Sequence, residues 1–368
     1  MTSRLFERTT INGMVLENRL VRSATWEGMC TPEGRPTPKL SACYQELAQG
    51  EVGLIISGYA FVRQDGQQLP GKMGIHTDDF ANEMRHLTEV VHASGGRIAM
   101  QLVHAGGKAN TMGLGTRPLA PSAIRNAQFT DIPDAMTPHD IEAIVTAFAQ
   151  GARRAKDYGF DAVQLHGAHG YLINQFLSPS TNQRTDGYGG SVENRRRFLM
   201  EVYGAVRQAV GNDYPVLIKL NGDDFIEDGL TLEEAVLAAK ALDQAGIDAI
   251  EVSGGTSASG DRTPARGRAK SSKDEGYHRS LAQRIKEAVQ CPIMVVGGFR
   301  SREVIEQTLQ EGVADYIALA RPFIREPNLA AKWHQGQTEA AGCQSCNGCF
   351  KPGLEEGGIY CVKLQNHS

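Results

Sequence analysis

The chain has 368 residues, with 38 Lys and Arg against 42 Asp and Glu, and its formal net charge is −4. This near balance argues against a nucleic acid or an anionic membrane surface as the main partner. Hydrophobic residues make up 41% of the chain, and no run approaches the about 20 apolar residues that a membrane span needs. Residues 1–8 contain no apolar segment typical of a secretory signal, so we expect a cytoplasmic protein.

Short apolar runs alternate with segments of helical periodicity along the chain. The runs predict eight β-strands, at 18–21, 53–57, 98–102, 162–165, 216–220, 249–252, 293–296 and 316–319. The longer periodic segments predict helices at 141–157, 191–210, 232–245 and 303–310. Nearly continuous apolar strands indicate a parallel sheet buried on both faces, which favours a (β/α)8 TIM barrel over an open doubly wound sheet. We assign the barrel to residues 1–336 and a short Cys-rich tail to residues 337–368.

The fourth predicted strand ends in a group of side chains that can donate or relay protons near neutral pH. His166, His169 and Tyr171 lie within six residues of one another, and the carboxyl ends of barrel strands meet on one rim. The two imidazoles could bind an oxygen atom of a substrate while Tyr171 delivers a proton. A metal site completed by Asp223 or His104, or a pair of hydrogen-bonded structural histidines, are the alternatives.

The seventh and eighth predicted strands end in residues typical of a phosphate site. Gly297 and Gly298 follow the seventh strand, and Ala320 and Arg321 follow the eighth. In barrels these two loops commonly bind a phosphate group through backbone N–H groups and an arginine. The ligand could be a sugar phosphate or a mononucleotide cofactor. Alternatively, the glycines only form a tight turn.

Two polar residues lie within predicted strands. Gln101 offers a donor and an acceptor, as a pyrimidine-like edge requires, and Lys219 would stabilise the anion formed when a neighbouring ring is reduced. Lys219 could also form the Schiff base of a phosphate-binding barrel lyase, or an ion pair with Glu251 or Asp223.

Longer motifs carry a resemblance to a known family. The stretch from His166 to Leu172, continued by 175–179, 182–186 and 188–195, is similar to the signature of the old yellow enzyme family of FMN-dependent oxidoreductases. Further matches lie at 18–19, 101–106, 120–122 and 320–322, so the resemblance covers residues 3–335. It implies the same TIM barrel that the strand pattern predicts.

The resemblance also implies a site and a reaction. The flavin ring would contact Ser23, Ala24, Gly58, Tyr59, Gln101 and Lys219, and its phosphate would contact Gly297, Gly298, Ala320 and Arg321. NADH or NADPH would reduce the flavin. An enone, enal or nitroalkene would then bind with its oxygen on His166 and His169, take a hydride on its β carbon and take a proton from Tyr171 on its α carbon. We expect a homo-oligomer whose partners are this small-molecule substrate and the nicotinamide cofactor.

Two features depart from the family pattern. Trp26 occupies a position where relatives often carry Cys or Thr, so it would narrow the pocket or change the redox potential, unless it only packs against a neighbouring loop. The tail cysteines 343, 346, 349 and 361 indicate metal ligation rather than disulfides. Their spacing resembles the iron-sulfur ligands of dienoyl-CoA reductase and trimethylamine dehydrogenase, which implies a 4Fe-4S cluster and electron exchange with a protein partner. A tetrathiolate also suits zinc, and an unmetallated tail is the third alternative.

Overall fold

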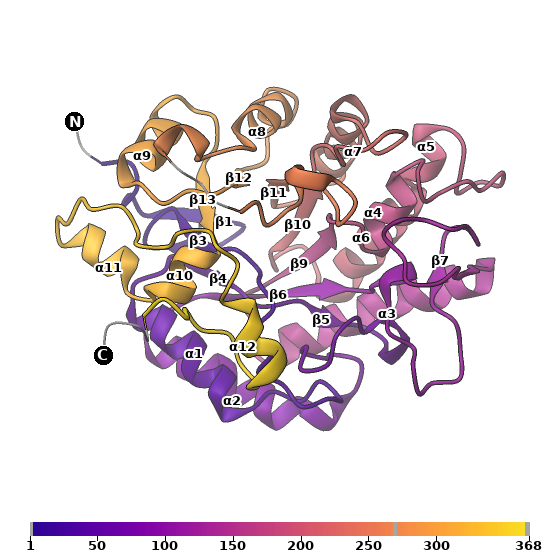
Figure 1. Ribbon diagram of the computed structural model, residues 1–368, viewed down its shortest axis with the longest axis horizontal. Helices are drawn as coiled ribbons and strands as arrows, with labels where there is room; N and C mark the ends of the chain where they lie inside the picture. The colour runs from indigo at the N-terminus through magenta and orange to yellow at the C-terminus, as the bar shows by residue number, and fades with distance from the viewer. Residues whose placement is uncertain (1–2, 268–270, 365–368) are drawn as a thin grey trace.

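The structure, a computed structural model, describes residues 3–267 and 271–364, so the last four residues of the predicted tail lie outside it. Eight parallel strands form a closed barrel in chain order, because β3 pairs with both β4 and β13 (Figure 1). These strands are β3 (Leu20–Arg22), β4 (Leu54–Ile56), β6 (Ile98–Val103), β9 (Ala162–Gly167), β10 (Val216–Asn221), β11 (Ala249–Ser253), β12 (Ile293–Val296) and β13 (Tyr316–Leu319). The predicted (β/α)8 TIM barrel is confirmed.

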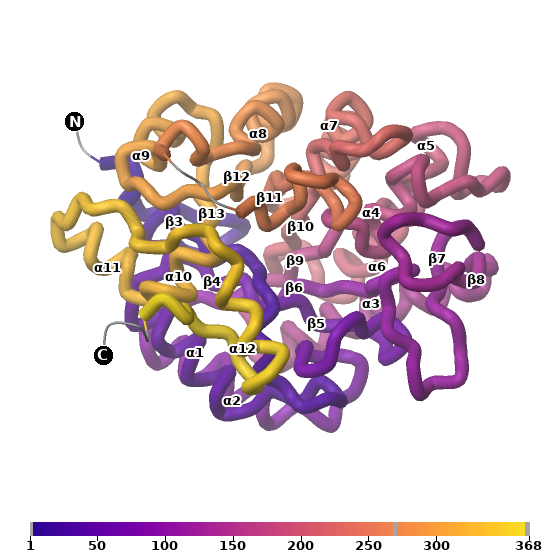
Figure 2. Tube along the Cα trace, viewed as in Figure 1, coloured from indigo at the N-terminus to yellow at the C-terminus, as the bar shows by residue number. Residues whose placement is uncertain are grey.

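Helices surround the barrel, as the tube along the chain also shows (Figure 2). They are α1 (Pro38–Gln49), α2 (Ala81–Ala93), α3 (Pro138–Asp157), α4 (Leu172–Leu177), α5 (Val192–Arg195), α6 (Arg197–Val210), α7 (Leu232–Gln244), α8 (Arg279–Lys286), α9 (Arg302–Gln310), α10 (Arg321–Arg325), α11 (Leu329–His334) and α12 (Phe350–Glu355). Thr137 and Thr231 begin α3 and α7 with reciprocal capping boxes. The helix predicted at 191–210 is divided at Arg196 into α5 and α6.

Short strands outside the barrel complete the fold. β5 (Ala60–Phe61) pairs with β6, and β7 (Leu119–Ala120) pairs with β8 (Asp134–Ala135). The hairpin of β1 (Thr9–Ile11) and β2 (Met14–Leu16) precedes the barrel and closes the end where its strands begin. The apolar-run pattern did not predict this hairpin.

The barrel strands are apolar on both faces because each contributes to two cores. On β10, Ile218 and Leu220 point outward into the core between the strands and the helices, whereas Leu217 points into the barrel. Burial of each such side chain stabilises the fold by about 1.5–3 kcal/mol relative to exposure. This double burial is the reason why the strands read as continuous apolar runs.

Inward-facing side chains change from apolar to polar along the barrel axis. Leu217 and Met294 form an apolar core with Leu16 of the hairpin. Two residues further along, Lys219 of β10 lies in register with Glu251 of β11. Polar groups therefore gather toward the ends where the strands finish, which is where barrel enzymes place their sites.

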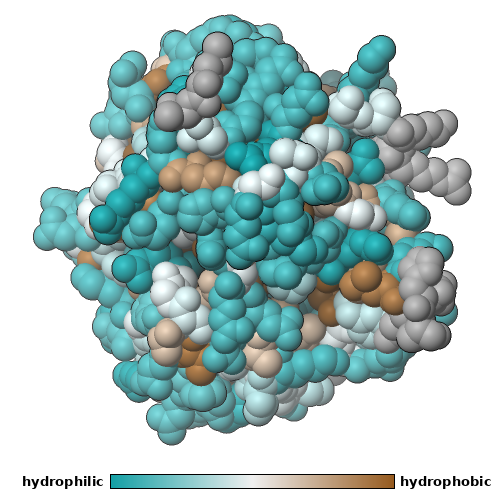
Figure 3. All heavy atoms as spheres, turned by 90° about the vertical axis from the view of Figure 1, so that its left-hand side faces the viewer, coloured by the Kyte–Doolittle hydropathy of each residue, from teal (hydrophilic) through white to brown (hydrophobic). Residues whose placement is uncertain are grey.

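The Cys-rich tail lies against the barrel rather than apart from it. Ile359 N–H donates to the carbonyl of Glu27, and Lys39 of α1 donates to the carbonyl of Gly357 at 3.1 Å. Figure 1 shows α12 in front of α1 and α2. The face that includes the left side of Figure 1 is mainly hydrophilic, with hydrophobic residues in small areas (Figure 3). No helix within residues 3–267 and 271–364 is long and apolar enough to cross a membrane.

Candidate active site

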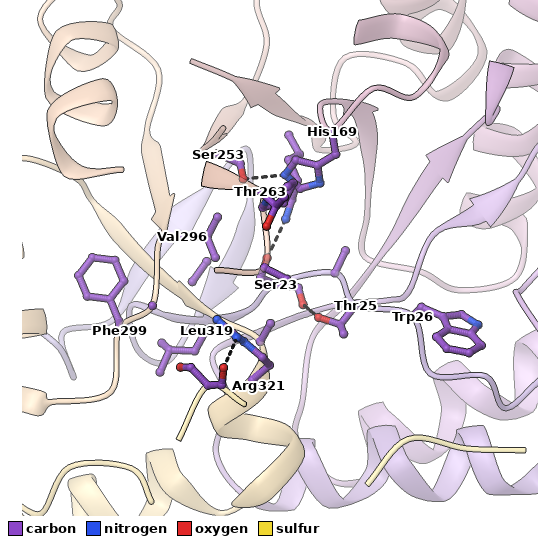
Figure 4. A pocket seen from close by; sticks show the side chains of 18 of the residues that line it. Ser23, Thr25, Trp26, His169, Ser253, Thr263, Val296, Phe299, Leu319 and Arg321 are labelled. Carbon is purple, nitrogen blue, oxygen red and sulfur yellow. Dashed lines mark hydrogen bonds between the residues drawn. The ribbon is translucent and has the colours of Figure 1, made fainter. Parts of the chain in front are cut away.

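A cavity of about 510 Å³ opens where the strands of the barrel finish (Figure 4). Its polar side carries Ser23, Lys219 and Ser253, and an arginine side carries Arg300 and Arg321. Six of the ten predicted cofactor contacts line it, namely Ser23, Ala24, Lys219, Gly298, Ala320 and Arg321. His169, Tyr171 and Trp26 line it as well, whereas His166 lies beside Tyr171 without lining the cavity. The cavity therefore brings two of the three predicted catalytic residues together with the predicted cofactor-binding segments.

Lys219 belongs to a buried network inside the barrel. Its Nζ lies 2.8 Å from Glu251 Oε1 and donates to Ser23 Oγ at 2.7 Å, and both charged side chains are at most 3% exposed. The other carboxylate oxygen of Glu251 accepts from Gln164 Nε2 at 2.8 Å, and Gln164 in turn accepts from Gln101 Nε2 at 2.7 Å. The predicted ion pair with Glu251 is confirmed. Lys219 Nζ is therefore engaged by Glu251 and Ser23, whereas a Schiff-base lyase needs this nitrogen to face its substrate.

The end of β9 holds the two predicted histidines in different ways. His169 adopts a left-handed backbone conformation with φ 62°, and its N–H donates to Asn221 Oδ1 at 3.2 Å. Its Nε2 lies 2.7 Å from Ser253 Oγ, as Figure 4 shows. In His166, Nδ1 accepts from the N–H of Ala168 at 3.4 Å. That contact leaves Nε2 of His166 to carry the hydrogen of the neutral ring.

Both imidazoles are neutral at physiological pH. Burial, followed by the charge of Lys219, holds the pKa of His166 well below its usual value. Burial, followed by His166 itself, does the same to the pKa of His169. Their ring centroids are 5.3 Å apart. Neutral N–H donors at this spacing can stabilise negative charge that develops on an oxygen atom without adding a full positive charge.

Within residues 3–267 and 271–364, no three His, Cys, Asp or Glu side chains form a group able to hold a metal ion. The metal alternative for His166 and His169, completed by Asp223 or His104, therefore has no support.

Tyr171 lies beside His166, with ring centroids 4.6 Å apart. Its Oη donates to Gln68 Oε1 at 2.8 Å, and Tyr59 Oη donates to the same oxygen at 2.8 Å. Burial raises the pKa of Tyr171 to about 12. The phenol therefore keeps its proton at neutral pH and can donate it to a substrate bound on the imidazoles.

The opposite side of the cavity is rich in arginine. Arg321 Nη1 donates to the carbonyls of Arg266 and Ser345 at 2.8 and 3.2 Å, and it has no carboxylate within 4 Å among the described residues. Arg300 Nε is buried without a hydrogen-bond partner in the same part of the chain. Gly298 has φ 73°, and a Cβ there would lie 2.7 Å from the Tyr277 ring. Arg300 also pairs with Glu275 at 3.7 Å, and Arg321 Nη1 also donates to Asn347 Oδ1 at 2.6 Å. Arg321 is therefore the guanidinium group without a carboxylate partner that this side of the cavity offers to a bound anion.

The N-terminus of α9 is already occupied by a carboxylate of the chain. Glu275 Oε2 accepts from the N–H groups of Arg300 and Ser301 at 2.7 and 2.9 Å. A phosphate in this cavity would therefore depend on arginine side chains and on the loop at Gly298 rather than on the start of α9.

Four predicted cofactor contacts do not line the cavity. The N–H of Gly58 donates to Glu27 Oε1 at 2.9 Å, and Gln101 is engaged with Gln164. Tyr59 packs edge-on against Tyr171 at 5.1 Å between ring centroids. The carbonyl of Gly297 accepts from the N–H of Tyr277 at 3.1 Å. These residues lie around the cavity, and their contact with a cofactor stays a prediction.

Trp26 lines the cavity and also packs against the tail. A Cβ added to Gly353 of α12 would lie 3.0 Å from its ring, and one added to Gly28 would lie 3.1 Å from it. Its Nε1 is buried with no hydrogen-bond partner among the described residues. In Figure 4 the indole lies to one side of Ser23 and Thr25. Trp26 therefore packs against a neighbouring segment and also borders the cavity, and its effect on the pocket stays a prediction.

The four tail cysteines line one small cavity beside α10, together with Arg321 and Arg325: Cys343, Cys346, Cys349 and Cys361. Arg325 Nη1 lies 3.4 Å from Cys361 Sγ. Burial raises the pKa of the Cys349 thiol to about 11. These cysteines also lack the grouping of three ligands that a metal ion requires, throughout the part of the chain that the structure describes. A cluster or zinc at this tail stays a prediction.

Three residues near Tyr171 were not predicted from the sequence: Gln68, Lys72 and Lys108. Lys108 lines the cavity, and Lys72 Nζ lies 3.3 Å from Gln68 Oε1. Lys108 follows β6 by only five residues, so its place after a strand end could have indicated it. Gln68 and Lys72 lie in an irregular segment after β5, where no periodic pattern points to a site.

Comparison with known proteins places this geometry in a family. The profile of the NADH:flavin oxidoreductase / NADH oxidase family matches residues 4–340. An NADH oxidase from Thermoanaerobacter brockii is 37% identical over 353 residues, which cover 94% of this chain and 53% of that protein. An NADPH dehydrogenase from Geobacillus sp. (strain WCH70) is 38% identical over 347 residues, which cover 94% of this chain and 98% of that one. The chain thus spans about half the length of the T. brockii relative.

Two solved structures support the same assignment. A 2-naphthoyl-CoA reductase in complex with 2-naphthoyl-CoA gives a TM-score of 0.90 at 28% identity, covering 97% of this chain and 56% of that one. The old yellow enzyme homologue from Zymomonas mobilis gives a TM-score of 0.77 at 28% identity, and the match covers 93% of this chain and 95% of that one. The resemblance read from the motifs is confirmed, and the chain belongs to the NADH:flavin oxidoreductase / NADH oxidase family, the family of old yellow enzyme.

Proposed function

We propose that this protein uses NADH or NADPH and an FMN cofactor to reduce an activated C=C bond, as in an enone, an enal or a nitroalkene. The observation that carries the proposal is the protonated phenol of Tyr171 in one cavity with the neutral imidazole of His169, next to the neutral imidazole of His166. His166 and His169 offer N–H groups to an oxygen atom, and Tyr171 holds a proton beside them.

The cavity suits FMN because its two sides differ chemically. Arg321 and the loop at Gly298 would hold the phosphate with Arg300 beside them, since Arg321 has no carboxylate partner among the described residues and Arg300 Nε has no hydrogen-bond partner there. Lys219 and Ser23 would meet the polar edge of the ring. Gly58, Tyr59, Gln101, Gly297, Ala24 and Ala320 are further proposed contacts. Val296, Leu319 and Phe350 give the cavity the apolar walls that a flat ring requires.

When it is bound, FMN supplies the hydride that NADH or NADPH delivers to it. The side chains of the protein supply the rest of the chemistry. His166 and His169 bind the carbonyl or nitro oxygen of the substrate, which draws electron density away from the β carbon and stabilises the enolate-like charge that forms there. Tyr171 then donates its proton to the α carbon, so the alkene gains one hydride and one proton.

The test is the Tyr171→Phe variant, followed in separate half-reactions. Removal of the phenolic hydroxyl should leave flavin reduction by NADPH within about twofold of the wild-type rate and slow enone reduction by about 10²–10⁴-fold. Tyr188→Phe is the matched control, because Tyr188 Oη lies 3.0 Å from Glu201 outside the cavity. Equal losses in both half-reactions would refute the proton-donor role.

A second candidate rests on the tail, where the four cysteines line one cavity next to Arg321. If they bind a 4Fe-4S cluster, the enzyme would exchange electrons with a protein partner. The purified protein would then contain iron and acid-labile sulfide in addition to flavin, and NADPH would reduce the flavin poorly. Zinc without iron, or neither metal, would refute this candidate and leave the first unchanged.

A further inference from the structure

Two lysine side chains, Lys72 and Lys108, lie beside Tyr171. Lys108 Nζ lies 4.7 Å from the centroid of the Tyr171 ring and donates to the carbonyl of His169 at 3.1 Å. Lys72 Nζ lies 3.3 Å from the centroid of the Tyr59 ring and 6.0 Å from that of Tyr171. Lys108 lines the cavity, whereas Lys72 is buried behind Tyr59 with 4% exposure.

Neither ammonium group has a carboxylate partner. No acidic oxygen lies within 4 Å of Lys72 or Lys108 in residues 3–267 and 271–364. The nearest candidates are engaged elsewhere. Glu27 is bound by Arg22 at 2.6 Å, and Asp65 is bound by Arg63 at 2.7 Å. The charge of Lys219, by contrast, is balanced by Glu251.

The groups that do contact these lysines are neutral. Gln68 Oε1 accepts from Lys72 at 3.3 Å, but the same oxygen already accepts from Tyr59 and Tyr171. Three donors on one carbonyl oxygen exceed its two lone pairs. The aromatic faces add cation–π attraction without cancelling charge. Lys72 is buried and Lys108 is partly exposed to the cavity, so an anion bound at Lys108 would stabilise the charged forms of both side chains.

We propose that Lys108 and Lys72 form an anion subsite that selects alkenes carrying a carboxylate in addition to the oxygen bound by the histidines. Lys108 contacts the carboxylate, and Lys72, on the other side of Tyr59, adds to the positive electrostatic potential at that place. The inference rests on the proposed function and names its substrate class. Because Lys108 touches the backbone of His169 and the face of Tyr171, the carboxylate lies close to the double bond. Unsaturated keto acids meet this requirement.

The lowered pKa values of the lysines agree with such a subsite. Burial lowers the pKa of Lys108 to about 8. Burial, followed by the charge of Lys108, lowers the pKa of Lys72 well below its usual value. A bound carboxylate would offset both effects by stabilising the protonated forms.

The test compares 4-oxopent-2-enoate with its methyl ester in the FMN-loaded enzyme under anaerobic conditions. Both probes offer the same ketone oxygen to the histidines, and only the acid carries a charge. We expect the wild-type kcat/KM to favour the acid by about tenfold or more, and Lys108→Met to reduce this acid-to-ester ratio by about tenfold or more. Lys108→Arg should retain the preference, and Lys72→Met should weaken it less than Lys108→Met. Retention of FMN by each variant reports that it is folded.

Lys240→Met is the matched control, because Lys240 is exposed on α7. An acid-to-ester ratio unaffected by both lysine variants would overturn the subsite. So would a Lys108→Met variant that impairs flavin reduction by NADPH but keeps the ratio, because the anion would then be a phosphate of the nicotinamide nucleotide. If the wild type reduces neither probe although NADPH bleaches its flavin, the proposed function itself fails.

Discussion

The Glu251→Gln variant tests how much the buried ion pair between Lys219 and Glu251 contributes to the stability of the barrel. Glu251 Oε1 contacts Lys219 at 2.8 Å and accepts from Ser23 Oγ at 2.6 Å, and Oε2 accepts from Gln164 at 2.8 Å. Glutamine has nearly the same shape but no charge, so Glu251→Gln leaves the Lys219 ammonium buried without a counterion. Conversely, Lys219→Met leaves the Glu251 carboxylate buried without a counterion.

The structure sets the expected magnitude. Both side chains are at most 3% exposed, and removing one partner of a buried ion pair costs about 3–5 kcal/mol of the free energy of unfolding. The double variant carries neither charge, and replacement of a whole buried pair is often neutral. We therefore expect the double variant to be more stable than either single variant.

Urea unfolding followed by far-UV circular dichroism, in the presence of saturating FMN, measures these free energies. The control is the exposed pair Arg153 and Asp157 on α3, whose side chains are 51% and 46% exposed. Neutralising either partner there should change stability by less than about 0.5 kcal/mol. Single variants of Glu251 and Lys219 that each cost less than about 1 kcal/mol and add in the double variant would refute the reasoning.

Three further outcomes follow. His169→Ala should weaken the binding of phenols to the oxidised enzyme, followed by the flavin spectrum, and an unchanged affinity would remove His169 from the oxygen site. Gly298→Ala should cost about 1–3 kcal/mol because of the φ of 73°, and it should loosen FMN; an unchanged dissociation constant for FMN would contradict this. Lys108, which faces Lys72, His169 and Tyr171, is charged only below its pKa of about 8. The kcat/KM for 4-oxopent-2-enoate should therefore fall above about pH 8 in the free enzyme, whereas that for the ester should not.

The barrel was predictable because each strand is buried on two faces. The strands predicted at 98–102 and 216–220 differ from β6 and β10 by one residue at one end. An apolar run of this kind predicts a buried strand whatever residues flank it. The β1–β2 hairpin was not predicted because its apolar side chains are buried only by the end of the barrel that it closes. The residues of that end come from strands far apart in the sequence.

The candidate site was predictable where it follows strand ends. His166, His169, Lys219 and Arg321 each come at or just after a strand, so the barrel alone brings them to one rim. Only the ion pair between Lys219 and Glu251 was predicted, as one of the alternatives for Lys219. The hydrogen bonds by which Gln164 connects Glu251 to Gln101 leave no pattern in the sequence.

The lysine subsite was not predictable. Lys72 and Lys108 are separated along the chain by α2 and β6, and a single lysine in a loop is ordinarily solvated. Only the packing of Tyr59 and Tyr171 brings a buried Lys72 and a partly buried Lys108 beside the proposed proton donor. The unbalanced charge at this place is a property of the folded chain and not of any local pattern.

The visible absorption spectrum of the purified protein, recorded before and after anaerobic addition of NADH or NADPH, tests the account most directly. We expect flavin absorbance from bound FMN, its loss when the nicotinamide nucleotide is added, and its return when 4-oxopent-2-enoate follows. A colourless protein that does not retain added FMN, or a flavin that neither NADH nor NADPH reduces, would contradict it.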